Sequence, residues 1–441
     1  MTQPPPLIYA ELLPNIRQIS VLAALPTPSD ATTLVSLSKD RAVLTLVHNG
    51  STASLQLPGA IATVYAPTQP QPTLSQLSWR IPLLASRSQP RAAPSLPAPW
   101  SAGALANTSS FSCRGCGQVI LSPGRVTTWR DLPSENWAEM MEFWHCHKPD
   151  VPVGEKEEEE GGDNTMKGYG ANTRMMAQKG VGKVDLTYFL LDSEDCTGLQ
   201  TSPSSLALTC ASCAAHIGIS TPAGHQLYKW SLSLTVPLTT PTSSPTTQLA
   251  PTSPPLPHFL LPQLHAQSSA LGVSKFIIRP PPPQAGTEDA DAESSALGVS
   301  KFIIRPPPPQ AGTEDADAEV GVYVWLFAPS LTVSFSSLSP SSSTSSPPPL
   351  NTPPHSSPPP PLPASKLLFR LPPTRDEATA LLDAPNSAVE EVRLPASVVC
   401  AFTTLLQESN DRLPEGARAF AGGWDVGILE VWDADEGSNR I

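Results

Sequence analysis

This chain of 441 residues has little charge and no concentration of positive charge. Charged residues make up 15% of it, and the formal net charge is −12. No cluster of lysine and arginine is present to replace the counterions on a nucleic-acid backbone, so direct nucleic-acid binding is not expected. The longest apolar run, Val320 to Ala328, is far shorter than the ~20 residues that cross a bilayer. We therefore expect no membrane association either.

Cysteine is scarce, and a leader pattern is missing. The N-terminal residues show no basic stretch followed by an apolar run, so we expect no secretory signal and a soluble protein of the cytoplasm, with the nucleus as a second location. Seven cysteines is an odd number, and four of them form two Cys-x-x-Cys pairs. In a reducing compartment this usage favours metal binding over disulfides, which makes zinc the first candidate.

Proline is the residue type in clear excess, with 54 in 441 residues against a usual level of about 5%. More than half of these prolines fall in residues 237–373, where serine and threonine are also frequent, so this tract is expected to be largely unfolded. The chain then divides into an N-terminal β region at 7–88, a zinc-knuckle region at 111–236, a Pro-rich linker at 237–319, and a C-terminal region at 320–441 that a Ser/Pro linker interrupts at 328–364.

The pattern of apolar residues predicts a mainly β (α+β) fold with a few helices, a zinc-joined β core and disordered Pro/Ser-rich linkers. Short runs rich in Val, Leu, Ile and Thr, bounded by turn residues, fill the N-terminal β region. Residues 185–191 and 366–370 also predict strands. Residues 227–234 alternate between apolar and polar, so one face of that strand is expected to be buried.

Two segments predict helices. The first begins near Ser134 in the zinc-knuckle region, with an apolar stripe at helical spacing, and an acidic loop follows it. The second begins at Pro395, and its apolar residues on one face are Val398, Phe402, Leu405 and Leu406. Residues 423–432 are compatible with either a strand or a helical turn.

Residues 268–293 and 294–319 are identical in sequence. A solenoid needs three or more diverged units to bury a shared core, so two perfect copies indicate a very recent duplication or an error in the assembled gene. Each copy contains one strand-like run, 274–279 or 300–305. Either run can pair with residues 320–327, but only one can hold the native register, and we expect the other copy to be displaced.

The most specific chemical motif is the pair of knuckles formed by Cys113 with Cys116 and by Cys210 with Cys213. A two-residue spacer directs both thiolates of each pair toward one ion, and four sulfurs complete the tetrahedron that zinc prefers. Gly117 suits the tight turn of the first pair. The alternative is that these are buried free cysteines in two loops. A structural zinc would contribute on the order of 10 kcal/mol to folding.

Between the knuckles lies the triplet His145, Cys146 and His147. The two histidines are further candidate zinc ligands, because Cys113 and Cys116 need only two partners. The triplet is also a candidate catalytic site, since imidazolium groups on both sides of Cys146 lower its pKa and favour thiolate chemistry. A third interpretation is that the histidines interact with the exposed carbonyls at the end of the helix.

Two further cysteines stand alone. Cys400 falls roughly opposite the apolar stripe of the helix from Pro395, so it is expected to be exposed, and it is the second candidate nucleophile. Cys196 lies in an acidic loop, where formation of the thiolate is disfavoured. No phosphate-binding glycine loop, Gly-x-Ser-x-Gly or His-Glu-x-x-His motif is present, which leaves nucleotide-binding, serine hydrolase and zincin classes without support.

Several blocks of the sequence carry a family resemblance. The longest spans 132–149, set between the two knuckles, and shorter ones are Ala10 to Arg17, Tyr228-Lys229-Trp230, Val324 to Phe327 and Trp424 to Leu429. Together they resemble the HECT-like family of ubiquitin-conjugating-enzyme-binding proteins, which is counted among the ubiquitin-protein ligases.

The resemblance implies a ubiquitin-protein transferase whose partners are a ubiquitin-conjugating enzyme, ubiquitin and protein substrates. It also supports the four knuckle cysteines as a zinc set and marks the block around Cys146 as functional. HECT ligases pass ubiquitin through a thioester on a cysteine of a C-terminal lobe, but this sequence shows no HECT-type two-lobe pattern. The competing interpretation is a zinc-stapled adaptor that holds a partner and transfers no ubiquitin.

Overall fold

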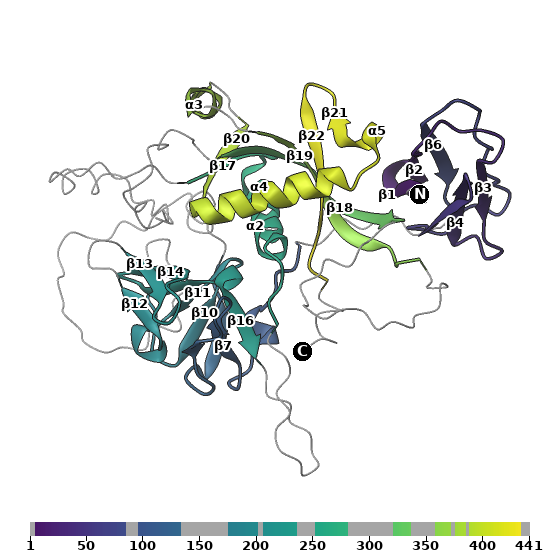
Figure 1. The fold of residues 1–441 in the computed structure, drawn as a ribbon. Coiled ribbons are helices and arrows are strands. Elements are labelled where there is room, and N and C mark those ends of the chain that lie inside the picture. The colour runs from purple at the N-terminus through teal and green to yellow at the C-terminus, as the bar shows by residue number, and fades with distance from the viewer. Residues whose placement is uncertain are drawn as a thin grey trace, which may run out of the picture.

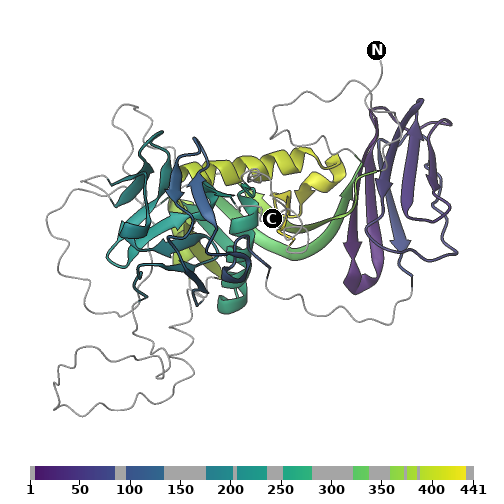
Figure 2. The same ribbon diagram turned by 90° about the horizontal axis from the view of Figure 1, so that it is seen from below.

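The computed structural model describes residues 5–84, 96–133, 175–201, 206–235, 252–280, 321–336, 358–371, 375–384 and 388–433. It is mainly β, as the sequence predicts, and strands of widely separated segments share one large sheet. In Figure 2 a β-sandwich lies at one end, the cysteine-bearing unit lies at the other, and a long curved strand pair lies between them. No helix in the described ranges is long and apolar enough to span a bilayer.

The N-terminal sandwich is built from two antiparallel sheets. One face is supplied by β1 (Leu7–Leu13), β2 (Gln18–Ala24) and β6 (Gln76–Pro82), and the other by β3 (Leu34–Leu37), β4 (Val43–His48) and β5 (Ser51–Gln56). Every second residue of β4 and of β6 is buried, which is the period of a half-buried strand. The inward residues of both sheets, among them Ile19, Leu44 and Leu55, form one apolar core.

The large sheet joins the sandwich to the C-terminal part of the chain. Its further strands are β17 (Lys275–Arg279), β18 (Val322–Phe335), β19 (Leu362–Arg370), β20 (Val389–Arg393), β21 (Ala419–Phe420) and β22 (Trp424–Glu430). The end of β18 pairs with β1, while its beginning pairs with β17, and β19 runs beside both halves. The pair of β18 and β19 therefore belongs to both ends of the molecule.

Helices cover the large sheet. The described helices are α2 (Pro257–Leu271), α3 (Arg375–Asp383), α4 (Ala396–Asp411) and α5 (Glu415–Arg418). Figure 1 shows α4 crossing the sheet, and its buried residues include Val398, Phe402 and Leu406, as the predicted stripe requires. Gly427 on β22 permits this approach, because a Cβ there would lie 2.7 Å from the side chain of Leu406.

The cysteine-bearing unit contains two further sheets. A three-stranded sheet consists of β7 (Ser110–Cys113), β8 (Val119–Leu121) and β16 (Leu232–Thr235). A seven-stranded sheet consists of β9 (Thr128–Asp131), β10 (Val181–Val184), β11 (Tyr188–Leu191), β12 (Leu199–Thr201), β13 (Ala207–Cys210), β14 (His216–Thr221) and β15 (Gly224–Tyr228). Between them packs an aromatic core in which Trp100 contacts Phe111, Phe189 and Phe259 of α2.

The predicted linkers are shorter than expected. β18 continues to Phe335 and β19 begins at Leu362, so both ends of the segment predicted as a linker at 328–364 are strand. The tract at 237–319, expected from its composition to be largely unfolded, contains α2, and the strand-like run predicted at 274–279 forms β17. Both elements fold because their apolar residues join the main core, which outweighs the local excess of proline.

Two other expectations are corrected or refined. Residues 227–234 do not form one alternating strand, because a 3-10 turn at Lys229–Ser231 separates β15 from β16 and nearly the whole segment is buried. Residues 424–430 form a strand, which decides between the two interpretations of the terminal segment.

The first copy of the duplicated sequence supplies β17. It pairs antiparallel with β18 and parallel with β20. The second copy, the helix predicted near Ser134 and most of the acidic loop after it lie outside the described residues.

Candidate metal centre

Each Cys-x-x-Cys pair closes the end of a strand with a tight turn. Cys113 ends β7, and its carbonyl accepts a hydrogen bond from the amide of Gly117 at 2.8 Å, while its own amide donates to the carbonyl of Gln118. Cys210 ends β13, and its carbonyl accepts a bond from the amide of Ala214 at 2.9 Å. The two knuckles therefore share one backbone pattern, although 94 positions separate Cys116 from Cys210.

The fifth residue of each knuckle has a positive φ. Gly117 has a φ of 76°, which glycine adopts without steric cost. Ala214 takes the same role in the second knuckle with a φ of 58°, a conformation that costs an alanine roughly 1 kcal/mol. An alanine held in this conformation indicates that the surrounding structure fixes the second turn tightly.

The two knuckles bring their four sulfurs together. Cys113 Sγ lies 3.6 Å from Cys213 Sγ, and Cys116 Sγ lies 3.5 Å from Cys210 Sγ. All four sulfurs lie within 4.8 Å of one another. A disulfide needs about 2.05 Å between sulfurs, whereas sulfurs bound to one zinc at about 2.3 Å lie close to 3.8 Å apart. The cluster therefore fits a tetrahedral zinc ion and not a pair of disulfides.

The environments of the thiols differ within the cluster. Burial raises the pKa of Cys113 to about 12, whereas a backbone hydrogen bond from Gln118 is the main cause that lowers the pKa of the exposed Cys116 to about 7. A zinc ion needs all four sulfurs as thiolates and would supply the positive charge that stabilises them. Four protein ligands leave no open position on zinc, so a metal held here has a structural role.

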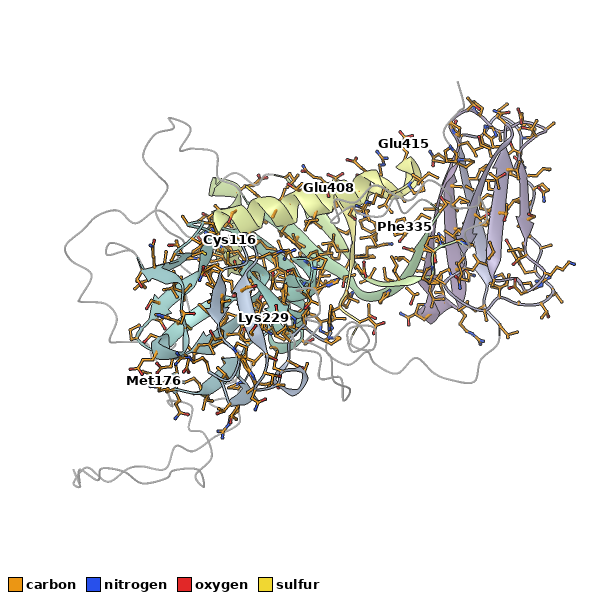
Figure 3. All side chains as sticks on the ribbon, turned by 60° about the horizontal axis from the view of Figure 1, so that its bottom comes forward. Cys116, Met176, Lys229, Phe335, Glu408 and Glu415 are labelled. Carbon is orange, nitrogen blue, oxygen red and sulfur yellow. The ribbon has the colours of Figure 1, made fainter. Side chains whose placement is uncertain are left out.

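The cluster joins the two sheets of the cysteine-bearing unit. Cys113 and Cys116 come from the three-stranded sheet, and Cys210 and Cys213 come from the seven-stranded sheet. The neighbouring Arg114 adds a second tie, since its guanidinium donates to the carbonyl of Pro254 just before α2 at 3.0 Å. Figure 3 shows Cys116 on the cysteine-bearing unit.

The remaining candidate residues fall into two groups. His145, Cys146 and His147 lie outside the described residues, so their roles as ligands or nucleophile stay predictions. Cys400 is exposed on α4, as predicted from the helix pattern, and its carbonyl accepts a hydrogen bond from the Thr404 hydroxyl.

Cys196 is poorly suited to thiolate chemistry. Burial raises its pKa to about 12, with a smaller contribution from Asp195 and Asp192. The acidic neighbours predicted this direction, but burial is the larger cause.

A buried lysine was missed by sequence reasoning. Lys229 is 1% exposed, its ammonium donates to the carbonyl of Pro99 at 3.1 Å, and it lies 5.2 Å from the ring centre of Phe189. Burial lowers its pKa to about 7, and Asp185 and Asp131 oppose this shift. In the sequence, apolar residues flank the lysine on both sides. This pattern alone does not distinguish a buried lysine from one on the exposed face of an alternating strand.

Lys229 borders a half-open cavity of about 330 Å³. Asp185 also lines it, and its pKa is raised by burial, although hydrogen bonds from Thr187 oppose the shift. The walls are otherwise largely apolar. Pro133, which also lines the cavity, is the last described residue before the 134–174 segment, which contains the His-Cys-His triplet.

Comparison with known proteins gives three findings. The chain is 30% identical over 138 residues to the uncharacterized protein YJR141W of Saccharomyces cerevisiae, covering 31% of this chain and 37% of the yeast protein. It is 26% identical over 125 residues to the uncharacterized protein C1734.10c of Schizosaccharomyces pombe, covering 27% of this chain and 33% of that protein. The aligned part thus spans about a third of each curated relative, and no solved structure matches the chain significantly.

The family comparison extends over almost all of the fold. The matched region runs from residue 11, in β1, to residue 426, in β22, and so includes both knuckles and the large sheet. On this evidence, the chain belongs to the family described as HECT-like ubiquitin-conjugating enzyme (E2)-binding.

Proposed function

We propose that this protein binds a ubiquitin-conjugating enzyme carrying ubiquitin and promotes transfer of the ubiquitin to protein substrates. The observation that carries the proposal is the family match, which extends over residues 11–426 and thus over nearly all of the described architecture. The four-cysteine cluster supports a scaffold role, because a saturated zinc site fixes the positions of two sheets without taking part in chemistry.

The chemical step is an acyl transfer. The amine of a substrate lysine attacks the thioester carbonyl carbon of ubiquitin, a C–N bond forms, the C–S bond breaks, and the sulfur leaves as a thiolate while the amine loses its proton to water. In the direct route the thioester belongs to the conjugating enzyme, and this protein supplies orientation. In the covalent route a thiolate of this protein first accepts ubiquitin, with Cys146 as the first candidate and Cys400 as the second.

The described thiols favour the direct route. Cys196 is held mainly as a thiol by burial, and the four knuckle cysteines are suited to a metal. Cys400 is exposed, yet it stands on a helix whose buried face packs against the large sheet, outside the cysteine-bearing unit.

A purified reaction tests the function. Activating enzyme, a charged conjugating enzyme and this protein are mixed, and ubiquitin attached to this protein or to a substrate is measured. Faster discharge of the conjugating enzyme to lysine in the presence of this protein supports the proposal. Stable binding of the conjugating enzyme without any faster discharge would instead support the alternative, a zinc-stapled adaptor.

A non-reducing gel separates the two routes. A reducible ubiquitin adduct that disappears in Cys146→Ala or in Cys400→Ala assigns the nucleophile, provided that the variant retains its zinc. Product formation without an adduct on the parent protein contradicts the covalent route.

A further inference from the structure

Five aromatic side chains form a continuous cluster on one face of the large sheet. We call this cluster the aromatic patch. Its members are Tyr323, Trp325 and Phe327 of β18, Phe420 of β21 and Trp424 of β22. The rings of Phe327 and Phe420 are tilted to each other with their centres 5.2 Å apart, and Trp325 contacts both of these rings and Trp424 edge-on. Such contacts order the rings before any partner arrives.

Two members of the aromatic patch are open to solvent. Phe327 is 42% exposed and Phe420 is 41% exposed. Among the described residues, they are the only aromatic side chains in the set of exposed large apolar residues, and they lie side by side. The other exposed apolar residues of the described chain are aliphatic or methionine. Exposure of two neighbouring phenylalanines is typical of an interaction surface, not of a core boundary.

Two cations flank the aromatic patch. The ammonium of Lys275 lies 5.0 Å from the ring centre of Trp325, and the guanidinium of Arg370 lies 4.4 Å from that of Trp424. Arg370 also donates to the carbonyl of Gly422, which ties the turn between β21 and β22 to β19. Within the described ranges, neither cation has a carboxylate close enough for an ion pair.

The charge of the aromatic patch is opposite to that of the chain. The protein carries a net charge of −12, so its overall field opposes an acidic partner. The aromatic patch instead offers two positive charges beside exposed rings, which complements an apolar side chain flanked by carboxylates. Tryptophan, phenylalanine and arginine at the centre of an interface are also the residue types that contribute most to binding.

We propose that the aromatic patch is the docking surface for the ubiquitin-conjugating enzyme, which presents an apolar side chain flanked by carboxylates to Phe327, Phe420, Lys275 and Arg370. This inference rests on the proposed function and adds the surface and its chemistry. The patch lies on β18, β21 and β22, and so includes one strand of the long pair of β18 and β19 that connects both ends of the molecule (Figure 1). A partner bound there contacts the large sheet and leaves the cysteine cluster free.

Affinity measurements with a panel of purified ubiquitin-conjugating enzymes test the docking surface. The double variant Phe327→Ser/Phe420→Ser is expected to weaken binding of the enzyme that the parent binds by about tenfold or more, because two central contacts are lost. Lys275→Glu/Arg370→Glu is expected to weaken it as well and to remove most of its dependence on salt. The matched controls are Val64→Ser, at a position 93% exposed in the sandwich, and Lys39→Glu, an exposed cation there.

Photo-crosslinking gives a second measurement, which detects the bound enzyme directly and does not rely on a loss of binding. A benzophenone side chain in place of Phe420 is expected to capture the bound enzyme, whereas the same group in place of Val64 is not. Equal zinc content and thermal unfolding of each variant show that its fold is intact.

The outcomes separate the docking surface from the function. If the parent binds a conjugating enzyme and the phenylalanine variants bind it equally well, the docking surface is wrong and the proposed function stands. If the charge-reversal variants bind normally while the phenylalanine variants do not, the inference that carboxylates flank the partner's apolar side chain is wrong. If the parent binds no member of the panel, the proposed function fails, and the docking surface fails with it.

Discussion

The N-terminal sandwich and the cysteine-bearing unit are both made of short, mostly antiparallel strands, yet the interactions that hold them differ. The sandwich encloses a continuous apolar core made of side chains from both of its sheets, with Leu44, Leu55 and Ile81 fully buried. The cysteine-bearing unit buries Lys229 and Asp185 and gathers four thiols from two distant segments. Both units have an apolar core, and the cysteine-bearing unit adds a candidate metal cluster and buried charged groups to its own.

Loss of a buried knuckle cysteine is expected to have the largest effect. Cys113→Ser or Cys210→Ser should remove the zinc and unfold the cysteine-bearing unit, since structural zinc contributes on the order of 10 kcal/mol. Hydrogen exchange should then show lost protection in β13 to β15 and retained protection in β4 and β5. Cys400→Ser, at an exposed cysteine on α4, is the matched control and should leave one zinc in place by native mass spectrometry.

The stability of the sandwich should fall when a cavity is made in its core and should not depend on zinc. Ile19→Ala removes a fully buried side chain and should lower the free energy of unfolding by about 2–5 kcal/mol. Val64→Ala, in the same unit but 93% exposed, should change it by less than about 0.5 kcal/mol. Chemical denaturation in the presence and absence of a zinc chelator measures both. A strong effect of the chelator on the protection of β4 and β5 would remove the contrast between the two units.

The buried lysine makes the stability of the cysteine-bearing unit depend on pH. Burial lowers the pKa of Lys229 to about 7 in the folded state, against 10.5 as its ordinary value. Between these values the unfolded chain binds more protons, so the free energy of unfolding rises with pH by up to about 1.4 kcal/mol per unit. Lys229→Met should abolish this contribution.

The contribution of Lys229 to this pH dependence is measured as the difference in unfolding free energy between the parent and the Lys229→Met variant. Unfolding of the parent and of Lys229→Met is followed between pH 7 and pH 10, so that cysteine and tyrosine titrations common to both largely cancel. A difference between the two proteins that stays constant over this range would show that Lys229 is charged in the folded state. Ile19→Ala, in the sandwich, serves as the control with an unchanged pH slope.

The duplication should matter least, because it belongs to neither unit. Deletion of 268–293 and deletion of 294–319 leave the same sequence, and in both cases one full copy remains to form the end of α2 and the whole of β17. Only the connection to β18 becomes shorter, from roughly 40 to roughly 15 residues, which changes stability by about 1 kcal/mol or less. A fall of several degrees in the melting temperature would show that both copies contribute to folding.

Sequence patterns predicted the features that depend on local order. The Cys-x-x-Cys spacing identified both knuckles, and the stripe through Val398 and Phe402 identified α4 together with the exposure of Cys400. The strands of the sandwich follow from their alternation. In each of these cases the residues that determine the structure lie within about one turn or one strand of each other.

Features that depend on distant contacts could not be predicted. The helix α2 contains Pro262 and lies in a proline-rich tract, but Phe259, Leu261 and Leu264 are buried in the common core. Lys229 is buried because the 3-10 turn places it against Phe189 and Pro99, which lie far away in sequence. The positive φ of Ala214 could not be predicted either, because this position holds an alanine, whereas the matching position of the first knuckle holds a glycine.

The separation of the two knuckles sets an order of events during synthesis. Cys116 and Cys210 are 94 positions apart, so a ribosome working at about 5–20 residues per second exposes the second pair about 5–20 s after the first. During that interval the first two thiols have only two of the four ligands that zinc requires. A zinc ion held by all four cysteines is therefore captured only after Cys213 has emerged, near the middle of the 441-residue chain, and until then the first knuckle is open to oxidation or to the wrong metal.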